Sequence, residues 1–515
     1  MRSHLSGLKP PYRLPSNVIY FHDWRYVQPG NAIGGWRSAE GESYPLFSPQ
    51  PAPEMRYEYS WCAMPGLELR AIPASKTEPV IASWDLPIPY LLSAATVIHD
   101  EGRYRLWFEQ PPTEAFGKRE AGQKNLLRYA ESDDGFSWRF PQLGLVSYQG
   151  DTNNNIVYGG PMTPDRGFHG GGVFKDPSAP PDERYKVFHL GKARGETLAR
   201  YLRERPDDIE PKQRGSDEPW ALFGAVSPDG FHWTPLPDPL VMQSSDTHNV
   251  CDYDVIRETY VGYVRTHVMQ RRTIGRLESP DFRRFPMPEQ VFRPGPGVSH
   301  TTLWYANAKT TMPGAKDYHV MFPKRWDVAT DRFDFFLATS PDNVVWDFVP
   351  NGPVCEPGEP AGWDGESVAP GCGLVDLPGH RTGVLYSGWP IPHKHPRHPP
   401  IGALAWAFWE KDRLAALSCP AEGRFQTYAL LFEDRHIRLN YRCPATGYIR
   451  IGVFLDGEPQ PGRNLKDCDF LCGNELDRLV TWNGEADMGH PEGAPVTLRV
   501  EMRNAELFSI RFADQ

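Results

Sequence analysis

Short stretches of alternating apolar and polar residues dominate the chain between about residues 90 and 417, and one phrase returns within them. It reads ESDDGFSW at 131–138, VSPDGFHW at 226–233, ESPDFRRF at 278–285 and TSPDNVVW at 339–346. In each copy an apolar run leads into Ser-x-Asp and a turn residue, with an aromatic residue three positions later. The phrase predicts a strand, a tight turn and a further strand that opens on a buried ring.

The spacing of the copies predicts the architecture. The serines lie at 132, 227, 279 and 340, so the intervals are 95, 52 and 61 residues, close to one four-stranded blade each apart from a charged insertion in the first. A fifth, degenerate copy fits ALAWAFWEKDRLAAL at 403–417. The sequence therefore predicts an all-β fold, a five-bladed β-propeller.

The two ends of the chain follow other patterns. Residues 1–87 read as an irregular, proline-rich lead-in that contributes a strand and part of one wall to the propeller of residues 88–417. From residue 418 the strands become longer and lose the repeated phrase, as in RFQTYALLF, HIRLNYR and VTLRVEMR. Six or more such strands predict a C-terminal β-sandwich over 418–515.

Composition narrows the class of protein. The chain has 515 residues with 53 Pro, 47 Gly and 16 Trp, which suits many turns between short aromatic strands. Its net charge of −10 disfavours a nucleic-acid or anionic-membrane partner, and no apolar run is long enough to span a bilayer. We expect a cytoplasmic protein, or an exported one whose leader is absent from this sequence, with its eight cysteines as free thiols.

Several longer phrases resemble a known group. RYRLWF, RYAESDDGFSW, LGLVSYQGDTNNNIV, FKDPSAPPDERYKVF and LKDCDFLCGNELDRLVTWNG look like the bacterial glycosyl hydrolase family 32-like group. That group is similar to the five-bladed propeller glycoside hydrolases, the invertase-like and arabinanase-like families. The resemblance covers about residues 17–512 and implies an enzyme that cleaves a terminal sugar from a plant or microbial glycan.

In those families three carboxylates project into the central funnel from the starts of inner strands. They act as nucleophile or base, as modulator of an acid's pKa, and as general acid. By position, the resemblance implies that Asp23 (VIYFHDWRYV) and Glu366 (GWDGESVAPG) are the opposed carboxyls and that Asp246 (SSDTHNV) tunes the acid. The families place their acid one or two blades before Glu366, so this carry-over departs from their pattern.

A second set of residues falls at strand ends that would face the funnel, where cations, imidazoles and indoles bind hydroxyl-rich or carboxylated sugars. The set comprises His169, His248, Arg265, His300, Lys324, Asp364 and Trp389. The resemblance implies a carbohydrate partner, no organic cofactor and no catalytic metal. It is compatible with a structural calcium ion in the propeller tunnel.

Other acids and histidines have simpler interpretations. Asp176 in FKDP follows its strand and opens the PSAPPDER hairpin, so we expect a structural role. The repeat-phrase aspartates, at 134, 229, 281 and 342, are expected to form hydrogen bonds inside outer turns. The histidines of PHKHPRHPP have no completing carboxylate or cysteine and are expected on a solvated rim loop.

Two other classes of function remain open. In a polysaccharide lyase, a His, Tyr or Arg would remove the proton next to a uronic-acid carboxylate, and Arg265, Lys324 and the histidines would matter more than the acids. A propeller that only binds carbohydrate is the third class, because one fold hosts many functions.

Overall fold

We analysed a computed structural model of the chain. It describes residues 5, 7–29, 35–37, 43–44, 56–58, 66–86, 93–111, 125–394 and 402–513. The chain divides into two compact units. One consists of residues 1–4, 73–348 and 352–411, and the other of residues 5–72, 349–351 and 412–515.

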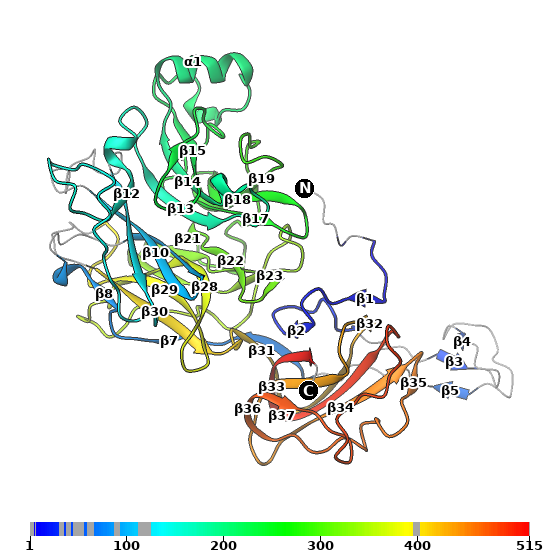
Figure 1. Ribbon diagram of the computed structural model, residues 1–515. Helices are drawn as coiled ribbons and strands as arrows, with labels where there is room; N and C mark the ends of the chain where they lie inside the picture. Colours follow the sequence, from blue (N-terminus) through cyan, green and yellow to red (C-terminus); the bar gives the residue numbers. More distant parts are fainter. Residues whose placement is uncertain are drawn as a thin grey trace. The chain divides into compact units, whose positions relative to one another are not determined.

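The first unit is a five-bladed β-propeller over the residues that the structure describes (Figure 1). Blade 1 consists of β9 (Ser93–Asp100), β10 (Arg103–Gln110), β11 (Leu126–Ser132) and β12 (Ile156–Gly159). Blade 2 consists of β13 (His169–Lys175), β14 (Tyr185–Lys192), β15 (Trp220–Ser227) and β16 (Thr234–Pro235). Blade 3 consists of β17 (Val250–Asp254), β18 (Thr259–Val268), β19 (Arg271–Ser279) and β20 (Glu289–Gln290).

Blades 4 and 5 depart from the simple pattern. Blade 4 consists of β22 (Lys309–Met312), β23 (Ala315–Met321), β26 (Ala338–Ser340) and β27 (Asp347–Phe348). Its first three strands continue past short breaks into β21 (Thr302–Ala306), β24 (Lys324–Asp327) and β25 (Arg332–Phe335). Blade 5 consists of β28 (Ser367–Leu377), β29 (Arg381–Trp389) and β30 (Ala403–Glu410), and β7 (Ser75–Lys76) and β8 (Ile81–Ala82) pair with β30. An early segment of the chain thus completes the last blade.

The inner strands of the five blades form a closed ring. Neighbouring inner strands run in the same direction where they pair, as at the parallel contact of β28 with β9. The contacts around the ring join Thr96 to Val173, Gly171 to Asn249, Asp252 to Lys309, Thr310 to Leu374 and Cys372 to Thr96. Ring closure leaves the inner strands of this unit without a free edge.

The repeated phrase forms the turn between the third and fourth strands. Gly135, Gly230, Phe282 and Asn343 all have positive φ, a conformation that favours glycine or asparagine, and the preceding Ser and Asp side chains bond the turn. In the first copy, Asp134 accepts hydrogen bonds from the backbone N–H groups of residues 136 and 137. The same bonds recur at Asp229, Asp281 and Asp342, so the structural role expected for these acids is confirmed.

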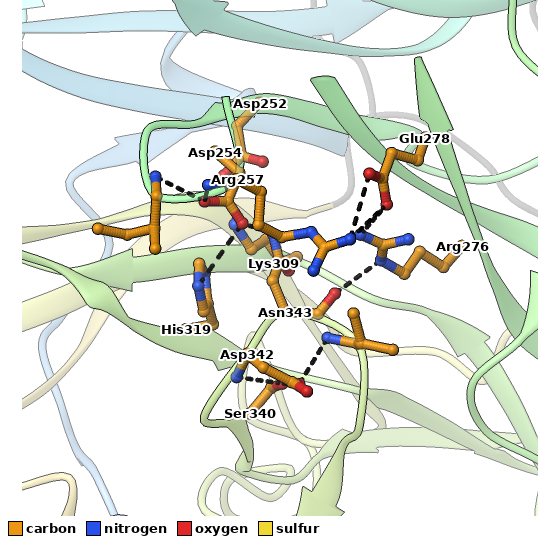
Figure 2. A network of polar contacts seen from close by, with 12 residues as sticks. Asp252, Asp254, Arg257, Arg276, Glu278, Lys309, His319, Ser340, Asp342 and Asn343 are labelled. Carbon is orange, nitrogen blue, oxygen red and sulfur yellow. Dashed lines mark hydrogen bonds and ion pairs between the residues drawn. The ribbon is translucent and has the colours of Figure 1, made fainter. Parts of the chain in front are cut away.

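Each of these turns also contacts the preceding blade. The Trp406 indole of blade 5 donates to the Gly135 carbonyl, and the Trp107 indole of blade 1 donates to the Gly230 carbonyl. Figure 2 shows the corresponding contacts of Asn343, which donates to Asp254 at 2.8 Å and accepts from Arg276 at 2.6 Å, both on blade 3. The repeated phrase therefore joins the blades to one another, which explains why it recurs.

The charged insertion of blade 2 contains α1 (Gly195–Glu204). Short 3₁₀ turns lie at Ser83–Asp85, Gly160–Met162, Pro181–Glu183 and Pro211–Gln213. Asp176 lies at the end of β13, fully buried against Lys186 at 2.7 Å, where it also bonds Ser178 and Tyr260, consistent with a structural role. Among the described helices none is long and apolar enough to cross a membrane.

The second unit is built around β37 (Thr497–Ala513), which lies in an eight-stranded sheet. Its other strands are β2 (Val18–Tyr20), β6 (Glu68–Ala71), β31 (Ala415–Gln426), β33 (His436–Cys443), β34 (Tyr448–Leu455), β35 (Glu458–Pro459) and β36 (Gly473–Leu479). A parallel pair joins β1 (Tyr12–Arg13) to β32 (Leu430–Leu431), and β3 (Gly35–Arg37), β4 (Ser43–Tyr44) and β5 (Arg56–Glu58) form a small separate sheet.

The C-terminal strands enclose one apolar core. The first half of β37 pairs with β34 and the second half with β33, so one long strand serves both parts of the sheet. Side chains from these strands bury a common cluster that includes Trp482 and Phe425. The predicted sandwich is thus one continuous hydrogen-bonded sheet folded around its core, because β37 is long enough to take part in both halves.

The lead-in does not behave as one segment. Within the described part of residues 1–87, β7 and β8 join the propeller, whereas β1, β2 and β6 pair with C-terminal strands. The described lead-in thus contributes two short strands to the propeller, while most of its described residues belong to the second unit. Backbone pairing explains the difference, since β32, β37 and β31 offer edges to β1, β2 and β6 respectively.

Candidate functional site

The starts of the inner strands meet around one cavity of about 320 Å³. All five blades contribute lining residues near the starts of their inner strands. Ala94 is the second residue of β9, His169 is the first of β13 and Ser367 is the first of β28. Residues 246–248 lie just before β17, and Tyr305 lies in β21, just before β22. Five of the residues expected at the funnel line it: His169, Asp246, His248, Lys324 and Trp389. Ring closure thus gathers side chains that are up to 220 positions apart (389 − 169).

A buried carboxylate supports the first of these side chains. Glu109, at the end of β10, is 1% exposed and lies 2.6 Å from Nδ1 of His169. Nε2 of the same imidazole lies 2.9 Å from the Asp246 carboxylate. The three side chains form a chain from the interior of blade 1, through blade 2, to the cavity wall formed before blade 3.

The two carboxylates set the charge of the imidazole. Burial acts to lower the pKa of His169, but the negative charge of Glu109 and the hydrogen bonds to Asp246 and Glu109 raise it well above its ordinary value. His169 is therefore an imidazolium at neutral pH. With both ring nitrogens engaged as donors, its orientation is fixed.

Gly170 allows this chain to form. Its φ is +62°, and a Cβ at this position would lie 1.8 Å from the Thr247 carbonyl oxygen, so only glycine fits. Its backbone N–H donates to the second oxygen of Glu109. The close approach of β13 to residues 245–249 brings His169 within reach of Asp246.

Asp246 is the carboxylate that the cavity exposes. Its side chain is 60% exposed, and Oδ2 lies 3.4 Å from Nη2 of Arg265, whose side chain is 6% exposed. Partial desolvation acts to raise the pKa of Asp246, but the hydrogen bond and charge of His169, with the charge of Arg265, lower it below its ordinary value. Asp246 is thus ionised and open to solvent, as a base or nucleophile must be.

A second imidazole lies beside the first in a different state. Burial lowers the pKa of His248 to about 4, so this side chain is neutral at pH 7. Its Nδ1 lies 3.5 Å from the Cys372 thiol, and its Nε2 has no hydrogen-bond partner among the described residues. One cavity therefore holds a charged and a neutral histidine, which suits proton transfer.

The wall formed by blade 4 combines cations with aromatic rings. The Tyr305 ring has Lys324 Nζ at 4.4 Å and the Arg272 and Arg265 guanidinium carbons at 4.6 and 5.5 Å from its centroid. Lys324 also lies 4.2 Å from the Phe333 ring centroid. Cation–π contacts of this kind help to hold charged side chains against aromatic rings.

Trp389 completes the cavity on the blade 5 side. Its side chain is largely buried, and the indole N–H has no hydrogen-bond partner among the described residues. An indole ring in a cavity wall suits a polyhydroxylated ligand, because the apolar face of a sugar can stack on an aromatic ring. His393 lines the cavity as well, so this histidine of the PHKHPRHPP tract faces the site, whereas residues 395–400 lie outside the described residues.

The remaining predicted residues lie elsewhere. Glu366 is one position before the lining residue Ser367, and its carboxylate is held by Arg332 at 2.6 Å. Asp364 is buried against Lys76 at 2.7 Å and the Tyr386 hydroxyl at 2.9 Å, so it fixes β7 to blade 5. His300 is exposed, and it does not line the cavity.

Asp23 belongs to the second unit, where its carboxylate forms an ion pair with the Arg25 guanidinium at 2.7 Å. Of the expected set of Asp23, Asp246 and Glu366, Asp246 is the member found among the described residues that line the cavity. Alternation along β28 explains Glu366: Ser367 faces the cavity, so its neighbour points to the other side, toward β25.

Two residues of the site, Glu109 and Tyr305, were not predicted from the sequence. Glu109 ends an apolar strand, and a lone acid in that setting is a signal that could have found it, because buried carboxylates are rarely left without a function or a partner. Tyr305 had no distinguishing signal within LWYAN. Within the described part of the chain, no three His, Cys, Asp or Glu side chains are grouped as metal ligands.

Comparisons with known proteins concern the fold. No family model matches the chain, and no curated protein matches it. Among solved structures it is similar to an N-acetylgalactosamine deacetylase from F. plautii in complex with blood group B trisaccharide, at 14% identity and TM-score 0.43 over 67% of this chain and 94% of the other.

It is also similar to the Bombyx mori GH32 beta-fructofuranosidase, at 9% identity and TM-score 0.40 over 85% and 95% of the two chains. The catalytic domain of the Coprinopsis cinerea GH62 alpha-L-arabinofuranosidase matches at 12% identity and TM-score 0.43 over 65% and 96%. Glycoside hydrolases are thus among the solved structures to which the chain is similar. Activity has to be argued from the cavity itself, since identities this low say nothing about it.

Proposed function

We propose that this protein is a glycoside hydrolase and that the cavity at the starts of the inner strands is its active site. The observation that carries the proposal is Asp246, an ionised and accessible carboxylate within a cavity to which all five blades contribute. Cations, imidazoles and aromatic faces around it match what a sugar needs for recognition.

Sugar binding follows from the opposite walls. Trp389 and Tyr305 offer aromatic faces for the apolar side of a sugar ring, while Lys324 and His248 offer polar groups for its hydroxyls. The cavity volume of about 320 Å³ lies at the low end of small-molecule sites. A site of this size suits one or two sugar units, as expected for cleavage near a chain end.

Hydrolysis needs a base or nucleophile and a proton donor on the other side of the bond. Asp246 takes the first role, and the Glu109–His169 pair keeps it oriented and ionised. Among the described lining residues there is no second carboxyl group, so we assign the proton donor to the hydroxyl of Tyr305. Arg265 is near both groups, with Nη2 3.4 Å from Asp246 and its guanidinium carbon 5.5 Å from the Tyr305 ring centroid.

The direct test is a screen of the purified protein against aryl glycosides and plant oligosaccharides, followed by Asp246→Asn and Tyr305→Phe on any substrate found. We expect release of a sugar by the parent and loss of nearly all turnover in Asp246→Asn. Asp134→Asn is a matched control, because this aspartate serves an outer turn. Turnover that survives both cavity substitutions, or sugar binding without turnover in the parent, contradicts the proposal.

A specific observation favours a second candidate, eliminative cleavage of a uronic-acid chain. His248 is neutral and lines the cavity, so its imidazole is a candidate for the base that removes a carbon-bound proton. Elimination leaves a conjugated double bond that absorbs in the near ultraviolet, and hydrolysis does not. Product absorbance therefore decides between the two reactions.

A further inference from the structure

Blade 1 carries a second pocket that takes no part in the proposed hydrolysis. Its volume of about 460 Å³ exceeds the cavity's volume of about 320 Å³, and among the described residues the two share no lining side chain. The pocket is lined by Phe108 and Gln110 of β10, by Arg128 of β11, by Leu86, and by eight residues between positions 140 and 155.

The end of β10 lies between the pocket and the wall of the cavity. Side chains alternate along a strand, so Glu109 and Gln110 point to opposite faces of the blade 1 sheet. Glu109 points toward blade 2, where it bonds His169. Gln110 lines the pocket, as do Phe108 and its cross-strand partner Arg128. One strand end therefore serves both sites, one on each face of the sheet.

An exposed aromatic ring forms part of the pocket wall. Phe140 is 38% exposed, and it meets the buried Phe108 ring edge to face, with 6.3 Å between the ring centroids. Tyr148 is a second, half-buried ring among the lining residues. A lone exposed ring on a surface is ordinary, but a ring on the wall of a pocket offers an apolar face on which a sugar can stack.

Amide groups supply much of the polar lining. The side chains of Gln142 and Asn153 are exposed there, and each amide offers both hydrogen-bond donors and an acceptor. Two charged residues occur among the described lining residues: Asp151 is exposed, and Arg128 is buried, with Nη1 donating to Oδ1 of Asn155 at 2.7 Å. The pocket thus matches a ligand that has many hydroxyl groups and no net charge.

Hydrogen bonds within the segment 146–156 hold this wall in shape. Tyr148 and Asp151 exchange backbone hydrogen bonds of 2.9 and 3.1 Å across a tight turn. The Asn154 amide donates to the Val146 carbonyl at 2.8 Å and accepts from the backbone N–H of Ile156 at 3.0 Å. A wall that is already fixed loses little freedom when a ligand binds, which favours affinity.

We propose that the blade 1 pocket is a second carbohydrate-binding site, which holds a neutral sugar unit of a glycan against Phe140, with its hydroxyls on Gln142 and Asn153. A volume of about 460 Å³ suits one or two sugar units. The inference goes beyond the proposed function, because binding here needs no chemistry in the central cavity. It gives the protein a hold on a polysaccharide that does not depend on turnover.

Affinity electrophoresis of the full chain tests the inference. Native gels contain soluble arabinan, galactan, arabinoxylan or glucomannan, and every sample carries Asp246→Asn so that no polymer is cut during the run. We expect at least one of these neutral polysaccharides to slow the protein relative to a gel without polymer. Polygalacturonate, which has a carboxylate on each sugar, should slow it less, because the exposed Asp151 disfavours a like charge.

Substitutions locate the binding. Phe140→Ala should raise the Kd for the retained polysaccharide about tenfold or more, because the sugar no longer buries an aromatic ring. Gln142→Ala combined with Asn153→Ala should raise the Kd about fivefold through the loss of hydrogen bonds from two exposed side chains. Phe470→Ala is the matched control: it removes an exposed phenylalanine ring from the second unit, so the Kd should not change. Trp389→Ala, in the central cavity, should also leave it unchanged.

Three results overturn the inference: no slowing in any neutral gel, stronger slowing by polygalacturonate than by every neutral polymer, or full affinity in folded Phe140→Ala and in the folded double variant. Thermal unfolding curves verify folding, and the double variant decides if Phe140→Ala does not fold. Binding that is lost in Trp389→Ala and kept in Phe140→Ala places the polymer in the cavity and refutes the second site.

The second site and the proposed hydrolysis can fail separately. If retention depends on Phe140 but no glycan is cleaved by the parent protein, the second site stands and the proposed hydrolysis fails. If glycans are cleaved and no polysaccharide slows the protein, the proposed hydrolysis stands and the second site fails.

Discussion

The propeller contains two kinds of acidic position, one at the outer turns and one at the cavity, and they are built in different ways. At the turns, Asp134 and Asp229 accept hydrogen bonds from backbone N–H groups two and three residues ahead. At the cavity, Asp246 is held by side chains from other strands, His169 and Arg265. Both settings keep the carboxylate ionised, but only the second exposes it beside a binding site.

The difference separates structural repetition from function. A hydrogen bond to the backbone two and three residues ahead can be repeated from blade to blade, because it needs only a local sequence. Each copy of the turn also joins its blade to the preceding one. Asp246 depends on Glu109 and His169, which come from two other blades and occur once. The residues that do not repeat are therefore the ones to which we assign chemistry.

The largest expected effect separates the two kinds of acid directly. Asp246→Asn should lower kcat/KM by about 1,000-fold, the scale expected when a group that transfers protons is removed. Asp134→Asn should leave kcat/KM within about twofold. The comparison fails if both variants, measured on the same substrate at equal concentrations of folded protein, lose activity alike.

The next effect tests the support behind the cavity carboxylate. Glu109→Gln should lower kcat by about tenfold to 100-fold, because an imidazole loses the charge that raises its pKa. Without Glu109, burial pulls the pKa of His169 down, so the imidazolium is lost at lower pH and the alkaline limb of the pH profile moves toward neutral. A uniform loss of activity across the pH range would show that Glu109 serves only to stabilise the fold.

A smaller effect belongs to the turns. Asp342 is 1% exposed and bonds Ser340 and the backbone of residues 344 and 345, so Asp342→Ala should lower the free energy of unfolding by about 2 kcal/mol. Asp134→Ala, at an exposed turn, should cost less than about 1 kcal/mol. Urea denaturation of the two variants measures both losses of unfolding free energy. Equal losses would show that burial of the aspartate does not set the size of the effect.

The smallest effect is a pH dependence of stability. Backbone and His232 hydrogen bonds, which outweigh desolvation, lower the pKa of Asp229 from 3.8 to about 2. Its folded pKa is depressed, so its contribution is complete above pH 4 and is lost as pH falls toward 2. Because the side chain is 38% exposed, we expect at most about 1 kcal/mol. Urea denaturation of the parent and of Asp229→Asn at pH 2 and pH 5 measures this contribution. A difference in unfolding free energy that is the same at both pH values would show that it does not arise from titration of Asp229.

Much of the fold follows from local sequence. The first three strands of blade 1 coincide with the alternating stretches SAATVIHD, RYRLWFEQ and LLRYAES, and the repeated turns lie where the phrase predicts them, with positive φ. The fourth strands were less predictable: β12 begins at Ile156, far beyond the turn at Gly135, and β7 and β8 complete blade 5 from the start of the chain. Such pairings depend on which edge is free after ring closure, a property of the assembled sheets.

The site shows the same division. His169, Asp246, His248 and Lys324 could be placed at the funnel because each lies at a strand end, and strand ends follow from the pattern. The partners of two acids in the expected three-carboxylate set could not be predicted from sequence: Glu366 pairs with Arg332, and Asp23 pairs with Arg25. The residues that a side chain contacts on neighbouring strands cannot be read from its own segment of the sequence.

By itself the sequence determined the strands, their turns and the number of blades, since these depend on alternation and on short-range hydrogen bonds. The tertiary structure decided which side chains share a cavity, which histidine carries a charge and which carboxylate stays exposed. The physical reason is that pKa and accessibility depend on burial and on charges within a few ångströms, and ring closure brings together residues from blades far apart in the chain.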